Sequence, residues 1–432
     1  MTSEIQEAEG RPGERRPPAV LTTNWPSLFL VYATGVTAAM GLGKFSVATD
    51  SLRHDLGIGL GALGWVISTV TAVSALLGTP LGLRLGRMST RKVLVAGAWA
   101  VAAAAAVEAL AAGFGTLLLI RVVEGVGYLM VVIACPTLVV RLCAPADTSR
   151  ALALWGTFVP VGLALSTALG GVAGTAFGWR GWMLVVAAIT ALPALVLSVT
   201  RVGSAPAGTG AAGADGATAR AAAGRLPRQR ERARQRLRHT GPVVLLALGF
   251  CMASLVTVAI FSLLPTYLEK ELGHSASDAG ATAGLISLVS VGGGLLIGWL
   301  LHRNPDSRPV LLCSVLTVAA AWAAFRPGGA AGLFVAGAVV ISAVNGILVG
   351  MILALVPRLV DSPDELALAN GIVTQGGSLG SLLGPPLYTM GVEGWDWTAV
   401  GTLTTAGMAV CWLLLTLALR RRVPSDRQER KA

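Results

Sequence analysis

Twelve apolar stretches constrain this chain more than any other feature of its sequence. Each is about 20 residues long, and an α-helix of that length spans the roughly 30 Å hydrocarbon core of a bilayer. Charged residues make up only 13% of the chain and apolar residues 54%, and the mean hydropathy is +0.71. A soluble protein would carry about 25% charged residues. We therefore predict an all-α membrane protein with twelve transmembrane helices.

The stretches form two groups of six on either side of a polar segment. They cover residues 25–49, 61–85, 93–112, 116–140, 151–175 and 181–200, then residues 242–268, 279–301, 308–324, 331–357, 368–390 and 398–419. We expect a tail at residues 1–24, a first half at 25–200, a basic linker at 201–240, a second half at 241–419 and a tail at 420–432. Gly82-x-x-x-Gly86-Arg87 and Gly298-x-x-x-His302-Arg303 each end an apolar stretch. The recurrence of this motif in both groups predicts two pseudo-symmetric halves.

Lysine and arginine residues are distributed unevenly over the polar segments. Of the 33, 27 lie in the termini and in alternate loops, and only four lie in the other loops: Arg53, Arg180, Lys270 and Arg326. This asymmetry places the basic side in the cytoplasm. We expect a multi-pass protein of the plasma (inner) membrane with both termini cytoplasmic. The basic tract at residues 225–238 either binds anionic headgroups, at about 1 kcal/mol per cation, or only fixes the topology.

Several classes of function are not indicated by the sequence. The net charge of +11 does not point to nucleic acid, because no basic face is interleaved with aromatic residues. The five cysteines have no CxxC spacing, which argues against a disulfide framework and a metal site. No nucleophile–base pair or phosphate loop is found, and the four histidines lie in or beside loops. We expect no enzyme activity, no cofactor, no metal and no removable signal peptide.

The loop at residues 82–92, GLRLGRMSTRK, resembles a signature of the major facilitator superfamily. That signature, G-x-x-x-D-R-x-G-R-R, joins the second and third helices, and Gly82, Arg87 and Arg91 match it. The resemblance implies a transporter of two six-helix halves, in which the aspartate of the signature helps to latch one state. Gly86 stands at the aspartate position, so this latch lacks its carboxylate, whereas Arg87 could still cap a helix C-terminus.

Two further motifs carry the same resemblance. Arg121-Val-Val-Glu-Gly-Val-Gly127 matches the fourth-helix pattern R-v-x-x-G-x-G, whose arginine the family ties to proton coupling or to packing beside the first helix. Gly380-Ser-Leu-Leu-Gly384-Pro385 resembles the antiporter signature, of which Gly162-x-x-x-Ser166 is a weaker copy. Small residues at this spacing let helix backbones approach closely, so we expect a structural role for both.

Within the superfamily, the chain is similar to the cyanate- and nitroimidazole-permease-like group. The residues that indicate this group are Gly43-Lys44, Leu52-Arg53-x-Asp55-Leu56, Gly64-Trp65, Trp155-Gly156-Thr157-Phe158-x-Pro160-x-Gly162 and Gly178-Trp179-Arg180.

Four charged residues lie within the predicted spans and away from their end residues: Lys44, Glu108, Arg121 and Glu124. Two cations and two anions cancel, which makes burial in a membrane tolerable. Arg121 and Glu124 are three residues apart and share a helix face. Our hypothesis is that they form a protonatable pair with Glu124 as the proton carrier, and that Lys44 contacts an anionic substrate. The alternatives are a structural ion pair, a Lys44 that extends to the headgroups, and a Glu108 that only partners Arg121.

Apart from Arg308 at the start of one stretch, the predicted spans of the second half contain polar but no charged side chains. Asn345, Asn370 and Gln375 are our candidates for lining a substrate site, together with Thr257, Thr374 and Tyr267. Each could instead bond to a neighbouring helix. Gly82, Arg87, Arg91, Glu108, Arg303, Gly380, Gly384 and Pro385 are expected to act in structure or gating.

We expect a secondary active transporter that moves a small organic or inorganic solute, with an anion as one candidate, by alternating access and with proton coupling. It would act as a monomer on a small-molecule substrate, with protons and the lipid bilayer as its other partners. The alternative of the same fold is a proton-driven efflux pump for drugs or metabolites. A membrane sensor is a third reading, for which the sequence has no soluble output domain.

Overall fold

The computed structural model describes residues 22–85, 88–144, 147–200, 202, 229–303, 311–326, 328–360 and 363–420. In these ranges the chain is helical and has no strand, as the sequence predicts for an all-α membrane protein. The expected tails, most of the linker and Arg87 lie outside the described residues. The expected start of the second half at residue 241 falls inside a helix that begins at Gln229.

Each of the twelve predicted stretches overlaps a helix in the described part of the chain. The first half contains α1 (Trp25–Gly43), α2 (Thr49–Leu56), α3 (Leu60–Ser68), the 3-10 turn η1 (Thr69–Thr71), α4 (Ala72–Leu85), α5 (Thr90–Glu108), α6 (Phe114–Leu142), α7 (Thr148–Trp155) and α8 (Phe158–Val199). The second half contains α10 (Gln229–Lys270), α11 (Ala276–Arg303), α12 (Cys313–Ala324), α13 (Ala331–Leu355), the 3-10 turn η4 (Val356–Arg358), α14 (Pro363–Trp395) and α15 (Thr398–Arg420).

Nine helices in the described part of the chain are long and apolar enough to cross a membrane. One of them, at residues 150–199, covers two predicted spans. This segment contains α7 and α8, and α8 consists of two helices that meet at Gly178, whose φ of 69° and ψ of 175° break the helical course. Glycine has no Cβ and adopts this left-handed φ without strain. The chain therefore reverses direction where the sequence analysis placed a short loop.

Two predicted spans are interrupted. The first stretch was expected to remain in one span to residue 49, but α1 ends at Gly43 and α2 starts a separate short helix at Thr49. The second stretch is broken by η1 between α3 and α4. Hydropathy reports only that side chains are apolar, so it cannot detect a break in a backbone that stays buried.

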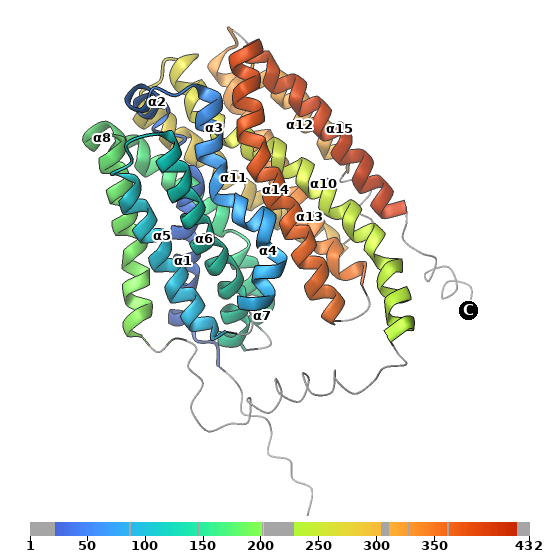
Figure 1. Ribbon diagram of the computed structural model, residues 1–432. Helices are drawn as coiled ribbons and strands as arrows, with labels where there is room; N and C mark the ends of the chain where they lie inside the picture. Colours follow the sequence, from blue (N-terminus) through green and yellow to red (C-terminus); the bar gives the residue numbers. More distant parts are fainter. Residues whose placement is uncertain are drawn as a thin grey trace, which may run out of the picture.

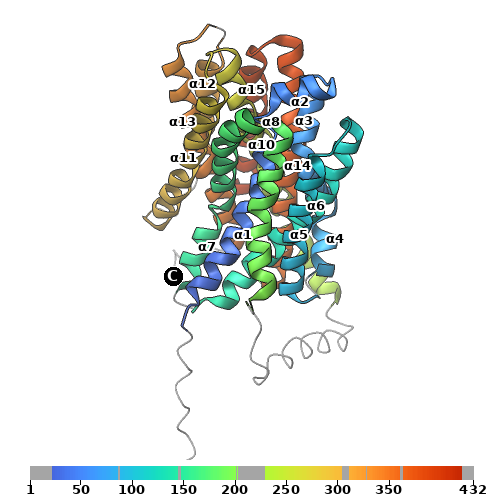
Figure 2. The same ribbon diagram turned by 90° about the vertical axis from the view of Figure 1, so that its left-hand side faces the viewer.

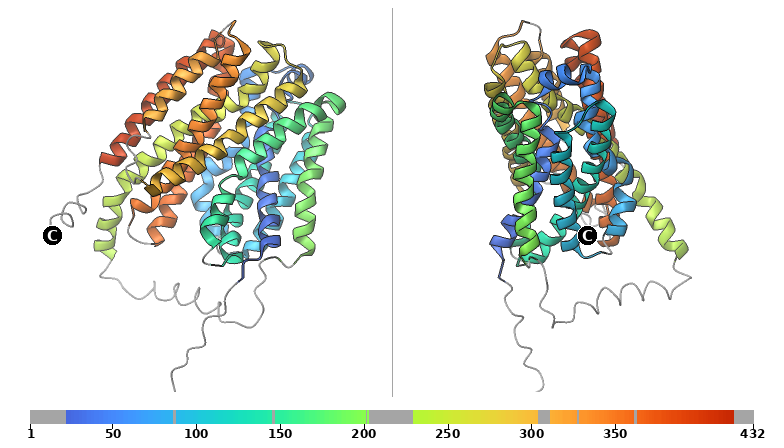
Figure 3. Two further views of the ribbon diagram at one scale, coloured as in Figure 1. Left: turned by 180° about the vertical axis from the view of Figure 1, so that it is seen from behind. Right: turned by 60° about the vertical axis from the view of Figure 1, so that its left-hand side comes forward.

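The two halves lie side by side and are joined along two seams. In Figure 1 the first half, blue to green, and the second half, yellow to red, converge at the end that carries α2. They diverge at the end near Thr200 and Gln229, and Figure 2 shows α2 and α7 at opposite ends of the bundle. We call these the far end and the linker end. One seam joins α3 and α4 to α14, and the other joins α8 to α11, which Figure 3 shows from behind.

Glycines allow helix backbones to touch along α14. A Cβ added at Gly380 would lie closer than 3.0 Å to the carbonyl oxygen of Cys251 on α10, and one at Gly384 would meet the carbonyl of Leu255. Pro385 is buried next to this contact. A glycine also allows close backbone contact at the seam between α8 and α11, since a Cβ at Gly280 would meet the carbonyl of Thr167. Small residues are the usual means of close helix approach in membranes.

We predict that Gly380→Ala destabilises the protein, because the added methyl group collides with a backbone carbonyl that cannot move aside. Overpacking of this kind costs about 1–3 kcal/mol. Gly292→Ala on α11 is the matched control, since a Cβ there meets nothing within 4 Å. Thermal unfolding in detergent should show a lower midpoint for Gly380→Ala and an unchanged or higher one for Gly292→Ala. Equal midpoints for the two variants would contradict this view of the contact between α10 and α14.

Candidate functional site

The four ionisable residues predicted within the spans meet in one place. Lys44 follows the last residue of α1, Glu108 is the last residue of α5, and Arg121 and Glu124 lie on α6. Their exposed fractions are 0%, 0%, 0% and 1%. We call these four residues the charge cluster. Lys44 does not extend to the headgroups, because its side chain is fully enclosed by protein.

Each cation of the charge cluster contacts both carboxylates. The Nζ of Lys44 donates to Glu124 Oε1 over 2.8 Å and also forms an ion pair with Glu108. The Nη1 of Arg121 donates to Glu124 Oε2 and lies 3.8 Å from Glu108 Oε1. The Phe45 ring centroid is 5.5 Å from Lys44 Nζ and 5.1 Å from Arg121 Cζ. Enclosed charges are tolerated only when they are paired and hydrogen-bonded, so the four residues form one ion-pair network in which each charge depends on the others.

Arg121 also joins the charge cluster to the break between α3 and α4. Its Nε donates to the carbonyl oxygen of Val66 over 2.9 Å, and its Nη2 donates to that of Ile67 over 2.8 Å. Both carbonyls belong to the last turn of α3, directly before η1. A side chain inserted into a helical hydrogen-bond ladder is a recognised cause of such a break. Gly125 permits this approach, since a Cβ there would lie 2.5 Å from the carbonyl oxygen of Val70.

A second group of polar contacts encloses the charge cluster from the far end. The Asp55 carboxylate on α2 accepts hydrogen bonds from Trp179 over 2.9 Å and from Arg180 over 2.8 Å. Arg180 also donates to the carbonyl oxygens of Ala109 and Ala111, each over 3.2 Å. These contacts tie α2 and α8 to the chain that directly follows Glu108. The cluster is thus held in a frame built wholly from the first half.

At the far end of the seam between α3 and α14, a carboxylate of one half binds the backbone of the other half. Glu393 of α14 accepts hydrogen bonds from the backbone N–H groups of Leu60 and Gly61, the latter over 3.0 Å. These donors belong to the first turn of α3, where unpaired N–H groups and the helix dipole favour a negative charge. A residue of the second half therefore caps a helix of the first half. Sequence analysis missed Glu393, because its partners are backbone groups about 330 residues away.

Two further contacts cross between the halves at the same end. Lys270 Nζ of α10 lies 3.0 Å from Asp50 Oδ1 of α2, at the exposed rim. The hydroxyl groups of Thr49 and Thr266 are 3.2 Å apart and buried. Closer to the centre, a Cβ at Gly64 of α3 would lie 2.6 Å from Pro386 Cα of α14. We call the contacts of Glu393, Lys270 and Thr266 with the first half the far-end gate.

The predicted polar residues of the second half do not join the charge cluster. The Gln375 amide donates to the carbonyl oxygen of Ala75 on α4 over 2.8 Å, so it bridges the halves. Asn345 is half-buried on α13, and Asn370 is exposed on α14. No group of acidic, histidine and cysteine residues that could hold a metal ion occurs among the residues that the structure describes.

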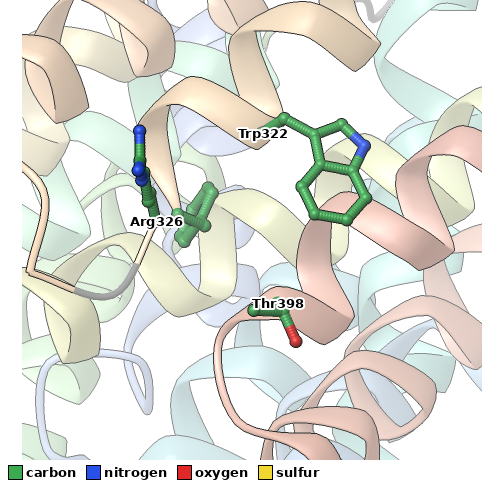
Figure 4. Close-up of a pocket in the computed structure, with 4 residues that line it drawn as sticks. Trp322, Arg326 and Thr398 are labelled. Carbon is green, nitrogen blue, oxygen red and sulfur yellow. The ribbon is translucent and has the colours of Figure 1, made fainter.

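A hollow of about 450 Å³ lies at the far end of the second half, lined by Trp322, Phe325, Arg326 and Thr398. Figure 4 shows Trp322 on α12, Arg326 just beyond the end of that helix, and Thr398 at the start of α15. The Trp322 indole donates to Thr405 over 3.0 Å, which fixes its orientation. The hollow contains none of the charge-cluster residues and lies away from both seams. It is therefore separate from the candidate site.

A family model described as the Major Facilitator Superfamily matches residues 31–362 and 305–432, two overlapping matches that span most of the chain. The chain belongs to the major facilitator superfamily. Among curated proteins, the MFS-type transporter Rv1250 of Mycobacterium tuberculosis (strain ATCC 25618 / H37Rv) is 26% identical over 189 residues. These residues are 43% of this chain and 31% of that protein, so the match spans about a third of the relative's length.

Solved structures of MFS transporters share the fold. A bacterial homologue of the human lysosomal transporter Spinster, in an inward-facing and unoccupied conformation, gives a TM-score of 0.71 at 17% identity and covers 92% of this chain and 95% of its own. A D-xylose–proton symporter gives 0.66 at 13% identity and covers 89% and 96%. At such identities the similarity concerns the fold alone, and it confirms the predicted MFS fold.

The MFS signature between the second and third helices is visible in part. Gly82 lies in α4, and Arg87 lies outside the described residues. Arg91 on α5 makes the helix-end contact that we expected of Arg87. Its Nη2 donates to the carbonyl oxygens of Leu197 over 2.9 Å and of Thr200 over 2.7 Å, at the C-terminus of α8. In the second half, the Arg303 guanidinium lies 4.2 Å from the Trp299 ring centroid.

We predict that Glu393→Ala weakens the far-end gate, because the first turn of α3 loses its cap. Removing a side-chain cap costs about 1 kcal/mol, which shifts a two-state equilibrium roughly fivefold. Electron–electron distance measurements between spin labels at Ser51 and Thr398, both exposed at the far end, should show a larger population of long distances.

Asp278→Asn is the matched control for the gate. The Asp278 carboxylate lies at the far end of the same half but accepts its hydrogen bond from Ser275, a neighbour on its own segment. Its distance distribution should equal that of the unmodified protein. An unchanged distribution in Glu393→Ala would show that the cap does not hold the gate.

Proposed function

We propose that this MFS transporter is a secondary active transporter that moves a small polar solute by alternating access and couples this movement to protons. The charge cluster is the observation that carries the proposal. Ionisable groups enclosed at membrane depth are costly, and they commonly mark ion pathways and proton relays. Here Arg121 links the cluster to α3, the helix that Glu393 caps from the other half. Protonation of a carboxylate would therefore act on an element of the gate.

The first substrate class that we propose is a small organic or inorganic anion. The second is a polar heterocycle. Lys44 would be the positive contact. In this conformation the Lys44 ammonium group forms ion pairs with Glu108 and Glu124, so an anion would have to replace one of these carboxylates. The displaced carboxylate would then favour a proton over an unpaired charge. Binding of the anion and binding of the proton would support each other. Asn345 and Asn370 are proposed to line the path of the solute.

The similarity to the cyanate- and nitroimidazole-permease-like group becomes part of this proposal. Its motif residues Asp55, Trp179 and Arg180 contact one another, so they form one structural unit above the charge cluster. We further propose that the linker end faces the cytoplasm of a plasma-membrane protein, in accord with its basic loops. The conformation would then be inward-facing, and the protein would act as a monomer.

Proteoliposomes with an imposed pH gradient test this function. Small anions, neutral polar solutes and hydrophobic cations are offered in turn, and both uptake and release are recorded. We expect an inward proton gradient to increase the accumulation of an anion several-fold. In Glu108→Gln and in Glu124→Gln, which remove charge from the cluster, the ratio of accumulation with the gradient to accumulation without it should be about one.

Glu271→Gln is the matched control for the transport assay, because Glu271 accepts a hydrogen bond from Trp397 outside the cluster. It should retain the response to the gradient. Expulsion of hydrophobic cations instead of anion uptake would favour the efflux pump and would refute the role of Lys44. A response to the gradient that persists in both cluster variants would refute proton coupling through the cluster.

A further inference from the structure

The two carboxylates of the charge cluster differ in their hydrogen bonds. Both oxygens of Glu124 accept one: Oε1 from Lys44 over 2.8 Å and Oε2 from Arg121. Gly41 on α1 leaves room for this arrangement, since a Cβ there would lie 2.6 Å from Glu124 Oε1. Glu124 is thus bonded in its ionised form by both cations, and such bonding favours the charge.

Glu108 is enclosed just as completely but is bonded differently. Neither of its carboxyl oxygens accepts a hydrogen bond from the residues that the structure describes. Lys44 and Arg121 reach it as ion-pair contacts, the one with Arg121 at 3.8 Å. An enclosed carboxylate without hydrogen bonds loses the stabilisation that water would give it, and it regains part of that free energy by binding a proton.

The free energy of adding a proton therefore differs between the two sites. A proton on Glu124 would weaken two charge-assisted hydrogen bonds, those that Lys44 and Arg121 donate to it. A proton on Glu108 breaks no hydrogen bond of acceptable geometry. It also turns Glu108 into a donor beside Glu124, because both carboxyl groups contact the same Nζ of Lys44.

We propose that Glu108, and not Glu124, is the proton-binding group of the charge cluster. The charged groups that face it are Lys44 beyond α1 and Arg121 and Glu124 on α6, while Arg180 binds the backbone next to it. The significance of this site for transport rests on the proposed function, but the binding of the proton does not.

The charge balance gives the bound proton a defined effect. With Glu108 ionised, the cluster has two cations and two anions and is neutral. With Glu108 protonated, the cluster carries one excess positive charge. The Phe45 ring stands about 5 Å from both cations, and the negative face of an aromatic ring stabilises such a charge. Proton binding thereby weakens the hold on Lys44 while the Arg121–Glu124 pair stays intact.

Infrared difference spectroscopy on the purified, unliganded protein tests the proposal. Spectra at low and high pH are subtracted, and the carbonyl stretch of an enclosed protonated carboxyl group is followed. We expect this band in the unmodified protein and in the control Glu271→Gln, and we expect its loss in Glu108→Gln. Glutamine is isosteric with protonated glutamate, so this variant reproduces the shape and charge of the protonated cluster.

Two carboxyl-retaining variants keep the test decisive if Glu108→Gln folds poorly. The band should change position in Glu108→Asp and keep its position in Glu124→Asp. The opposite pattern, a full band in folded Glu108→Gln, or no pH-dependent band in the unmodified protein would each overturn the proposal. Because no substrate is used, the result is separate from the transport assay: a Glu108 band without a response to the gradient would refute proton coupling alone.

Discussion

Four enclosed charges must neutralise one another, and this constraint determines how the first half is assembled. Lys44, Glu108, Arg121 and Glu124 come from three parts of the chain, and none of them has water as an alternative partner. Their pairing therefore fixes the end of α1 against α5 and α6. Lys44 directly follows Gly43, the last residue of α1. The ammonium of Lys44 reaches two carboxylates from this position, and the Lys44 carbonyl oxygen accepts a hydrogen bond from Trp182 over 2.9 Å.

The charge cluster and the far-end gate share α3. Arg121 binds the carbonyl oxygens at the C-terminal end of this short helix, and Glu393 of the second half binds the N–H groups at its N-terminal end. Both contacts use backbone groups that a helix end leaves unpaired. An electrostatic change at Arg121 and a separation of the halves at Glu393 thus act on the same nine-residue helix. Lys44 has a second connection, because the chain that follows it forms α2, where Asp50 meets Lys270.

Much of the fold could be predicted from the sequence, because apolar length and basic loops follow directly from the properties of a bilayer. The four enclosed charges were found in the same way, since an ionisable residue stands out in an apolar stretch. The contacts between the halves could not be predicted from the sequence in this way. Glu393 and Gln375 bind backbone carbonyl or N–H groups, which every residue possesses and which no motif marks. The break at η1 was missed because it depends on Arg121, a residue of another helix.

The position of the proton shows where sequence spacing misleads. Glu124 lies three residues from Arg121 on one helix face, and this proximity made it the natural candidate for the proton carrier. In our proposal the proximity has the opposite effect, because a carboxylate that is hydrogen-bonded by two cations favours its ionised form. Glu108 accepts no hydrogen bond from the described residues, and its neighbours come from other helices, so spacing along the chain reveals nothing of its state. A group that exchanges a proton must be able to exist in both forms, and we propose that Glu108 is that group in this cluster.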